Sequence, residues 1–140
     1  MTICTTDGFV VDLPGHFYGT QNDASIMKII MEDPNGISQL LQPGDIFILD
    51  RGFRDVKDYS EGLGYVVLMP ALEGMAKQLS AKDANLSRKV TKCRWVIEAV
   101  HGIVSGRSKL LHNQVDNKLL PKIGTYACIS CYLNNEYGKR

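Results

Sequence analysis

The sequence predicts an α/β fold in which a small mixed sheet is flanked by helices. Two continuous apolar runs, Ile46–Leu49 and Tyr65–Met69, have the length and composition of buried strands. An Asp-Gly turn separates two β-rich segments near the N-terminus, and a helical pattern extends from Ser80 to about Val104. The chain of 140 residues is the size of one domain, so we expect a single domain over residues 1–140.

Composition indicates a soluble intracellular protein. Hydrophobic residues make up 44% of the chain and charged residues 22%, which is ordinary for a globular domain. No apolar run approaches the roughly 18 residues that a membrane span needs, and the N-terminus has no signal-peptide pattern. The four cysteines are too few and too scattered for a disulfide framework, so we expect reduced thiols and no membrane contact.

The N-terminal third predicts a hairpin, a loop and a helix. Thr2–Thr5 and Phe9–Leu13 are expected to pair as antiparallel strands across the Asp-Gly turn. Pro14–Gln21 contains two glycines and a proline and reads as a loop. Asn22 or Asp23 then caps a helix that ends near residues 33–36, and its predicted inward face carries Ile26, Ile29 and Ile30.

The central segment predicts a strand, a helix and a parallel strand. Ile46–Leu49 is expected to be buried on both faces, with Asp50 at its C-terminal end. Asp55–Leu63 is a short helix closed by glycines, and Tyr65–Met69 is the second strand. The stretch from Pro70 to Leu79 is ambiguous.

A long helix follows, with Ser80 as its cap and Asp83 three residues further on. Arg88 and Lys92 point away from the predicted buried stripe, and Glu98 lies on the margin between core and solvent. The apolar positions that make the stripe recur every three or four residues: Leu86, Val90, Cys93, Ile97, Val100 and Val104.

The C-terminal segment predicts a loop at Gly106–Asn117 and a last helix at Leu119–Leu133, with Leu120, Ile123, Ala127 and Leu133 inward. Cys128 and Cys131 lie three residues apart in this helix. A pair of this spacing is found in zinc sites, but no second close pair of ligands accompanies it, and a cysteine in an apolar helix usually packs as a small hydrophobe.

Charge divides the chain into two unequal parts. Residues 1–85 carry six Lys/Arg against twelve Asp/Glu, and residues 86–140 carry ten against three, so their net charges are −6 and +7. A basic part beside an acidic part suits a protein that holds a polyanion next to a cation. A solvated basic helix face is the alternative interpretation.

Asp50 and Glu98 are the candidate catalytic residues and metal ligands. An acid at the C-terminal end of a central strand lies where open α/β sheets bind ligands, and an acid on a helix margin can face it. Two such carboxylates favour Mg²⁺ or Mn²⁺. Two other roles stay open: Asp50 could cap a turn, and Glu98 could pair with Arg94 one helical turn earlier.

Four segments, in this order, resemble the DDE superfamily endonuclease domain of Harbinger-like transposases. The Asp-Arg-Gly-Phe-Arg-Asp block after the central strand and the Arg-Trp-x-x-Glu helix are specific when they occur together. The resemblance covers nearly the whole chain. The segments are Thr6–Asp12, Gln21–Ala24, Asp45–Asp55 and Ala84–Val100.

The resemblance implies an RNase H-like fold in which three acids hold two divalent metal ions, Mg²⁺ or Mn²⁺, for DNA phosphodiester cleavage and transfer. Asp50 matches the second acid and Glu98 the third, while Asp23 matches a helix-opening residue that is not a ligand. In that family the first acid lies on a strand that precedes the hairpin. The resemblance therefore implies a partial domain that lacks the first, central strand of the order 3-2-1-4-5.

We expect this partial domain to be inactive as a nuclease by itself. DNA is the expected partner, bound through Arg88, Lys92 and Arg94, with Arg107 and Lys109 beyond them. The resemblance also implies a nuclear location and a separate DNA-binding domain or partner protein. The alternatives are a non-catalytic remnant that binds DNA or protein, and a gene fragment with no stable fold.

Overall fold

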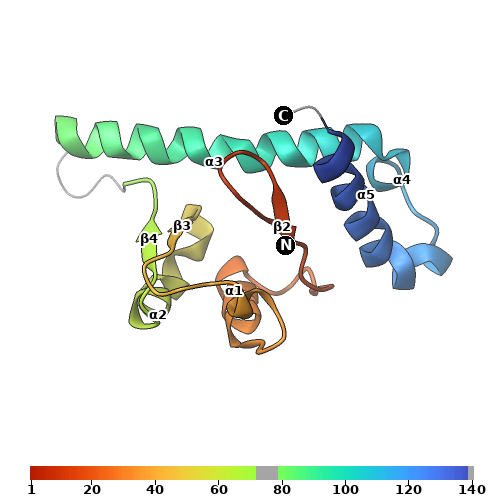
Figure 1. Ribbon diagram of the computed structural model, residues 1–140, viewed down its shortest axis with the longest axis horizontal. Coiled ribbons are helices and arrows are strands. Elements are labelled where there is room, and N and C mark those ends of the chain that lie inside the picture. The colour runs from red at the N-terminus through yellow and green to blue at the C-terminus, as the bar shows by residue number, and fades with distance from the viewer. Residues whose placement is uncertain (72–78, 139–140) are drawn as a thin grey trace. The chain divides into compact units, whose positions relative to one another are not determined.

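The computed structural model describes residues 1–71 and 79–138 (Figure 1). The chain divides into two compact units: Met1–His16 with Trp95–Arg140, and Phe17–Arg94. Helix α3 (Ala81–Arg107) contributes to both. The single domain expected over the whole chain stays a prediction, and each unit is described by itself below.

The predicted N-terminal hairpin is confirmed. Strands β1 (Ile3–Cys4) and β2 (Val10–Asp12) pair antiparallel, with Ile3 opposite Asp12. The carboxylate of Asp7 accepts a hydrogen bond from the backbone N–H of Phe9 at 3.1 Å, and Gly8 has a φ of 88°. A side chain at Gly8 would be strained in that conformation, which explains why the turn reads Asp-Gly.

The hairpin packs on the second part of α3 and on helix α5 (Ile123–Tyr137). Asn135 of α5 fixes the contact, because its side chain accepts from the N–H of Val10 at 3.0 Å and donates to the C=O of Val10 at 2.8 Å. Two backbone groups of β2 are thus satisfied by one side chain. The buried cluster comprises Val10, Val100, Val104 and Cys131.

The C-terminal segment differs from its prediction in two ways. The expected loop at Gly106–Asn117 is partly helical, because α3 continues to Arg107 and a short helix, α4 (Lys109–His112), follows. The expected last helix begins as the 3-10 helix η3 (Asn117–Lys122), which contains a proline, and becomes α5 only at Ile123. Leu120 and Leu133, which were predicted to face inward, are exposed. Cys131 is the residue of α5 that is buried in the cluster.

In the unit of residues 17–94, helix α1 (Asp23–Glu32) begins as predicted. Asn22 is the cap, and its side chain accepts from the N–H of Ser25 at 2.7 Å. The predicted inward position of Ile29 is wrong, because that residue is 46% exposed. Helix α1 packs against the 3-10 helix η2 (Arg51–Val56). The buried face is set by that neighbour and consists of Ala24, Met27, Ile30 and Met31.

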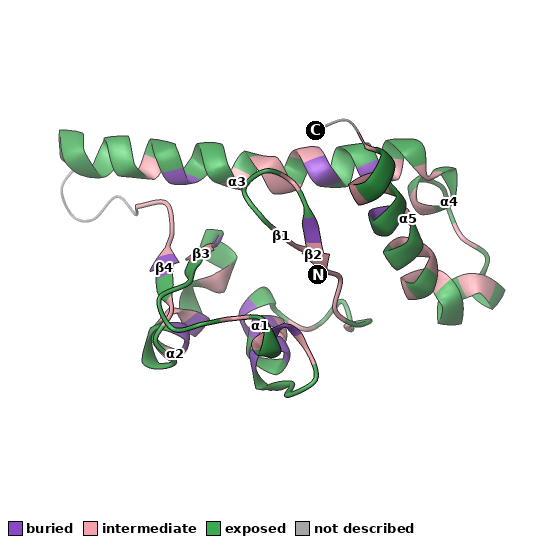
Figure 2. Cartoon of the chain, viewed as in Figure 1, coloured by how far each residue is buried: buried purple, intermediate pink, exposed green. Residues whose placement is uncertain are grey.

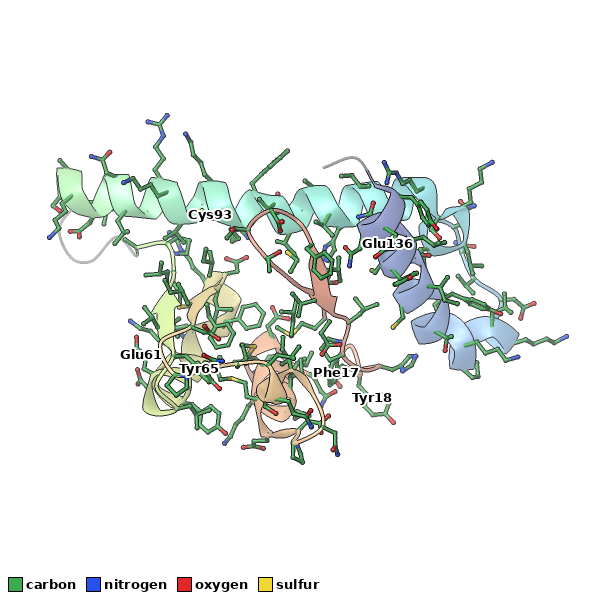
Figure 3. The ribbon with its side chains drawn as sticks, in the orientation of Figure 1. Phe17, Tyr18, Glu61, Tyr65, Cys93 and Glu136 are labelled. Carbon is green, nitrogen blue, oxygen red and sulfur yellow. The ribbon has the colours of Figure 1, made fainter. Side chains whose placement is uncertain are left out.

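Strands β3 (Ile46–Ile48) and β4 (Val66–Leu68) form the predicted parallel pair. Helix α2 (Lys57–Gly62), preceded by η2, connects them. The aromatic rings of Phe47 and Tyr65 meet edge to face with centroids 5.1 Å apart; Tyr65 is labelled in Figure 3. Burial of the first strand on both faces is wrong, because Ile46 is 60% exposed where no further element of the described chain covers it.

Helix α3 begins at its predicted cap, since Ser80 Oγ accepts from the N–H of Asp83 at 3.1 Å. The predicted stripe is only partly correct. Val90, Val100 and Val104 are buried, whereas Leu86 and Cys93 are exposed, and Figure 2 shows the first turns of α3 largely exposed. The predicted helical period is correct, but the buried contacts along α3 are interrupted.

The described strands form two separate pairs, β1-β2 and β3-β4, with helices around them. A mixed α/β architecture is confirmed, while an RNase H-like sheet stays a prediction. The ambiguous stretch between Pro70 and Leu79 lies mostly outside the described residues. No helix of the described chain is both long and apolar enough to span a bilayer.

Candidate metal site

Asp50 lies two residues beyond the last residue of β3, at the carboxyl end of the parallel pair. Its Oδ1 accepts from the backbone N–H of Arg51 at 2.6 Å, and its C=O accepts from the N–H of Phe53 at 3.1 Å. Asp50 is therefore the cap of η2, which agrees with the interpretation of this acid as a turn residue. The capping bond orients the side chain and still leaves the carboxylate able to accept other contacts, because each oxygen has two lone pairs.

The second carboxylate oxygen of Asp50 forms an ion pair with α3. Arg94 Nη1 lies 2.7 Å from Asp50 Oδ2, and the two side chains are 28% and 51% exposed. The pair joins residues 44 positions apart, so no local signal in the sequence could have revealed it. The guanidinium of Arg94 thus contacts Asp50, the acid that the sequence predicts to bind a metal ion.

Two further contacts hold α3 to the carboxyl ends of the strands. Arg51 donates from Nη2 to the C=O of Ala71 at 2.9 Å, and Ala71 donates its N–H to Ser87 Oγ at 3.2 Å. Val90, between Ser87 and Arg94 on α3, is only 3% exposed. The edge of the sheet where α/β proteins bind ligands is therefore bounded by this part of the helix.

Gly52 lies close to the first turn of α1. A Cβ atom at Gly52 would lie 2.9 Å from Oδ2 of Asp23, so the Asp23 carboxylate would have to shift to admit a side chain there. Asp23 is in the first turn of α1, where the helix dipole stabilises a negatively charged side chain. Its role as a helix-opening residue fits this position.

Glu98 lies on α3 in the other unit and is exposed. Asp50 belongs to the unit of residues 17–94, and the two units are not placed relative to each other. The meeting of Asp50 and Glu98 across a shared ion is therefore still a prediction. So is the alternative pairing of Glu98 with Arg94.

The predicted nucleic-acid contacts on α3 fall into two kinds. Arg88 and Lys92 are exposed and lie one helical turn apart, which presents two positive charges to solvent. Arg94 is only partly exposed and is engaged by Asp50. Arg107 and Lys109 lie at and just after the end of α3, and both are exposed.

The Asp50 carboxylate meets part of what a divalent ion needs. A partly exposed carboxylate that already accepts a cation has the chemistry of a Mg²⁺ or Mn²⁺ ligand, and such ions bind through one or two carboxylates plus waters and phosphate oxygens. Among residues 1–71 and 79–138, no group of three or more His, Cys, Asp or Glu side chains is arranged to hold a metal. Asp50 therefore fits as one ligand of an ion that needs others.

The cysteines divide into exposed and shielded thiols. Cys93 and Cys128 are exposed, whereas Cys131 is buried in the hydrophobic cluster. Burial raises the pKa of the Cys131 thiol, with a smaller contribution from Cys128, and burial followed by the charge of Asp7 raises the pKa of Cys4. Cys131 thus packs as a small hydrophobe, the role that the sequence favoured over a zinc ligand.

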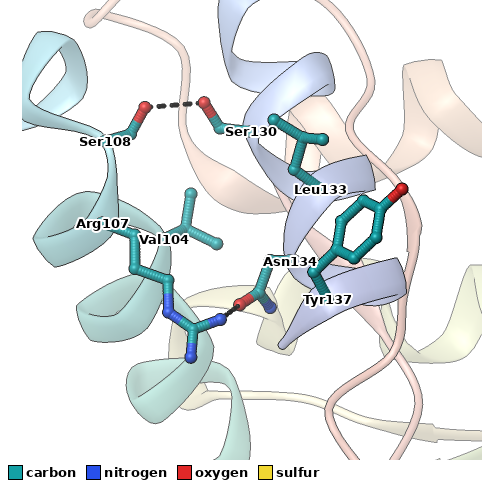
Figure 4. A pocket seen from close by; sticks show the side chains of 7 residues that line it. All are labelled: Val104, Arg107, Ser108, Ser130, Leu133, Asn134 and Tyr137. Atoms are coloured by element: carbon teal, nitrogen blue, oxygen red, sulfur yellow. Dashed lines mark hydrogen bonds between the residues drawn. The ribbon is translucent and has the colours of Figure 1, made fainter. Parts of the chain in front are cut away.

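An open pocket of about 360 Å³ lies between the end of α3 and α5 (Figure 4). Four of its polar side chains bond in two pairs: Arg107 Nη1 donates to Asn134 Oδ1 at 2.8 Å, and the Ser108 and Ser130 hydroxyls are 2.7 Å apart. These bonds join α3 and the segment after it to α5, so the four side chains stabilise the packing of the helices.

Comparison with known families gives one result. The family model described as DDE superfamily endonuclease matches residues 1–135. No curated protein and no solved structure matches the chain. The match covers the hairpin, the Asp50 loop and the whole of α3, and DDE endonucleases typically use divalent metal ions.

Proposed function

Because this chain belongs to the DDE superfamily of endonucleases, we propose that it is a Harbinger-like transposase domain whose Asp50 and Glu98 hold a divalent ion for DNA phosphodiester chemistry. Family membership implies a transposase-like nuclease with DNA as its substrate. The finer assignment rests on the Asp-Arg-Gly-Phe-Arg-Asp block and the Arg-Trp-x-x-Glu helix. The same resemblance leads us to propose a nuclear location.

The position of Asp50 carries this proposal. The carboxylate stands at the carboxyl end of a parallel strand, is oriented by the N–H of Arg51 and already attracts a positive group. A divalent ion at that edge would supply Lewis acidity and lower the pKa of a bound water. The protein's own part is to fix the carboxylate and to present basic side chains to DNA.

The two strand pairs support an RNase H-like origin. In an RNase H-like sheet of order 3-2-1-4-5, strands 3 and 2 form an antiparallel pair and strands 4 and 5 form a parallel pair. The described residues contain one pair of each kind, in the matching chain order.

The test uses Mn²⁺ in two assays. Loss of the free-ion signal in electron paramagnetic resonance measures binding, and conversion of supercoiled plasmid to nicked circles measures cleavage. We expect Asp50→Ala and Glu98→Ala each to weaken Mn²⁺ binding at least tenfold, because a carboxylate ligand is lost. Asp58→Ala, in the exposed first turn of α2, is the matched control. Unchanged Mn²⁺ affinity in both test variants would refute the assignment.

A non-catalytic DNA-binding remnant is the second candidate, favoured by the two exposed cations of α3. Arg88 and Lys92 would contact phosphates and carry little sequence information. This candidate predicts DNA affinity that falls steeply with salt and does not depend on Mg²⁺, and a double Arg88→Gln, Lys92→Gln variant with a salt slope lower by about 2. Affinity that rises with Mg²⁺ would favour the nuclease.

A further inference from the structure

We propose that Arg94 is a resident cation that competes with the divalent ion for Asp50, so that the metal binds only when the guanidinium leaves. This inference rests on the proposed function and adds a positioning residue that controls metal occupancy. It starts from the ion pair between Arg94 Nη1 and Asp50 Oδ2, which are 2.7 Å apart.

Both oxygens of Asp50 are engaged, but by different kinds of donor. Oδ1 accepts a neutral backbone N–H from Arg51, which can persist when a metal binds, since it orients the carboxylate. Oδ2 faces a full positive charge from Arg94. A divalent ion on that oxygen would meet the guanidinium at close range, and two cations on one carboxylate oxygen repel each other.

The ion pair is partly open to solvent. Asp50 is about half exposed, so the pair is screened by water and is of the modest strength typical of surface ion pairs. A divalent ion, with twice the charge, can displace the guanidinium. The displaced guanidinium would remain tethered to α3.

The competition predicts a gain of metal affinity when the charge is removed. We expect Arg94→Gln to tighten Mn²⁺ binding on the order of tenfold, and Arg94→Lys, which keeps the charge, to stay within about threefold of the original protein. Lys89→Gln removes one positive charge from an exposed position on the same helix, and it should alter affinity less than twofold. Circular dichroism melts check that each variant folds.

A merely structural role of Arg94 predicts the opposite result. If the ion pair is needed to hold Asp50 in place, Arg94→Gln weakens Mn²⁺ binding, and that outcome overturns the proposal, as does unchanged affinity. Asp50→Ala separates the two claims. Loss of binding in Asp50→Ala with no gain in Arg94→Gln rejects the competition alone, whereas retained binding in Asp50→Ala rejects the metal site itself.

A second measurement needs no variant. Phenylglyoxal modifies accessible arginines, and peptide mass spectrometry gives the rate for each one. Saturating Mn²⁺ should raise the modification rate of Arg94 several-fold and leave that of Arg88 unchanged. A rate for Arg94 that stays constant or falls when Mn²⁺ is added would contradict displacement.

Discussion

The two units of the chain are closed by contacts of different range. In the unit of residues 17–94, the buried Ser60 hydroxyl lies 3.6 Å from the sulfur of Met31 and 2.9 Å from the C=O of Val56, so neighbouring segments pack on each other. In the other unit, Asn135 bonds to Val10 across 125 residues. One unit is therefore built from successive elements and the other from the two ends of the chain.

This difference matters for the proposed site, because Asp50 belongs to the locally built unit and Glu98 to the one closed at long range. Local contacts form readily, whereas contacts between distant segments must offset a larger loop-closure entropy. We therefore expect loss of a long-range contact to loosen the second unit without loosening the first.

The largest expected effect tests the local unit. Met27 of α1 is 4% exposed, so Met27→Ala should lower the free energy of unfolding by roughly 2–5 kcal/mol through lost burial and a cavity. Ile29→Ala, on the exposed side of the same helix, is the control and should cost less than about 1 kcal/mol. Chemical denaturation measures both, and equal losses would show that the burial of α1 is assigned incorrectly.

The next effect tests the long-range tie. Asn135→Ala removes both side-chain bonds to Val10 and should lower the free energy of unfolding by about 1–3 kcal/mol. Hydrogen exchange should speed up at the amide of Val10 and in β2 while the amides of α1 stay protected. Glu136→Ala, an exposed neighbour on α5, should leave exchange at Val10 unchanged. Equal exchange rates at Val10 in the two variants would show that the Asn135 side chain does not stabilise β2.

These results show where sequence patterns suffice. The Asp7-Gly8 hairpin, the Asn22 cap and the Ser80 cap were predictable, because each depends on residues within three positions. The placement of Asp50 at a strand end was predictable for the same reason.

Features that depend on distant neighbours were not predictable. The exposure of Ile46 and Cys93 follows from which elements cover the strands and α3, and periodicity does not contain that information. The ion pair of Arg94 with Asp50 and the bonds of Asn135 to Val10 likewise need the tertiary arrangement. The sequence therefore identified the acid but not the cation on it.

The smallest expected effect concerns the thiols. Cys93 and Cys128 should react with a disulfide reagent before Cys4 and Cys131, whose pKa values are raised mainly by burial. A raised pKa in the folded protein means that stability is intact below the ordinary cysteine pKa and falls as pH rises above about 8.5. Mass spectrometry of labelled peptides measures the order, and rapid labelling of Cys131 would contradict its place in the cluster.

Iron-directed cleavage tests the central claim most directly. Fe²⁺ with ascorbate generates hydroxyl radicals that cut the backbone close to a bound ion, and Fe²⁺ can take the place of Mg²⁺ or Mn²⁺ at an oxygen-rich site. We predict two clusters of cuts, one beside Asp50 and one beside Glu98, both absent in Asp50→Ala and both suppressed by excess Mn²⁺. Cuts beside only one acid, or cuts that survive in Asp50→Ala, would contradict a shared metal site.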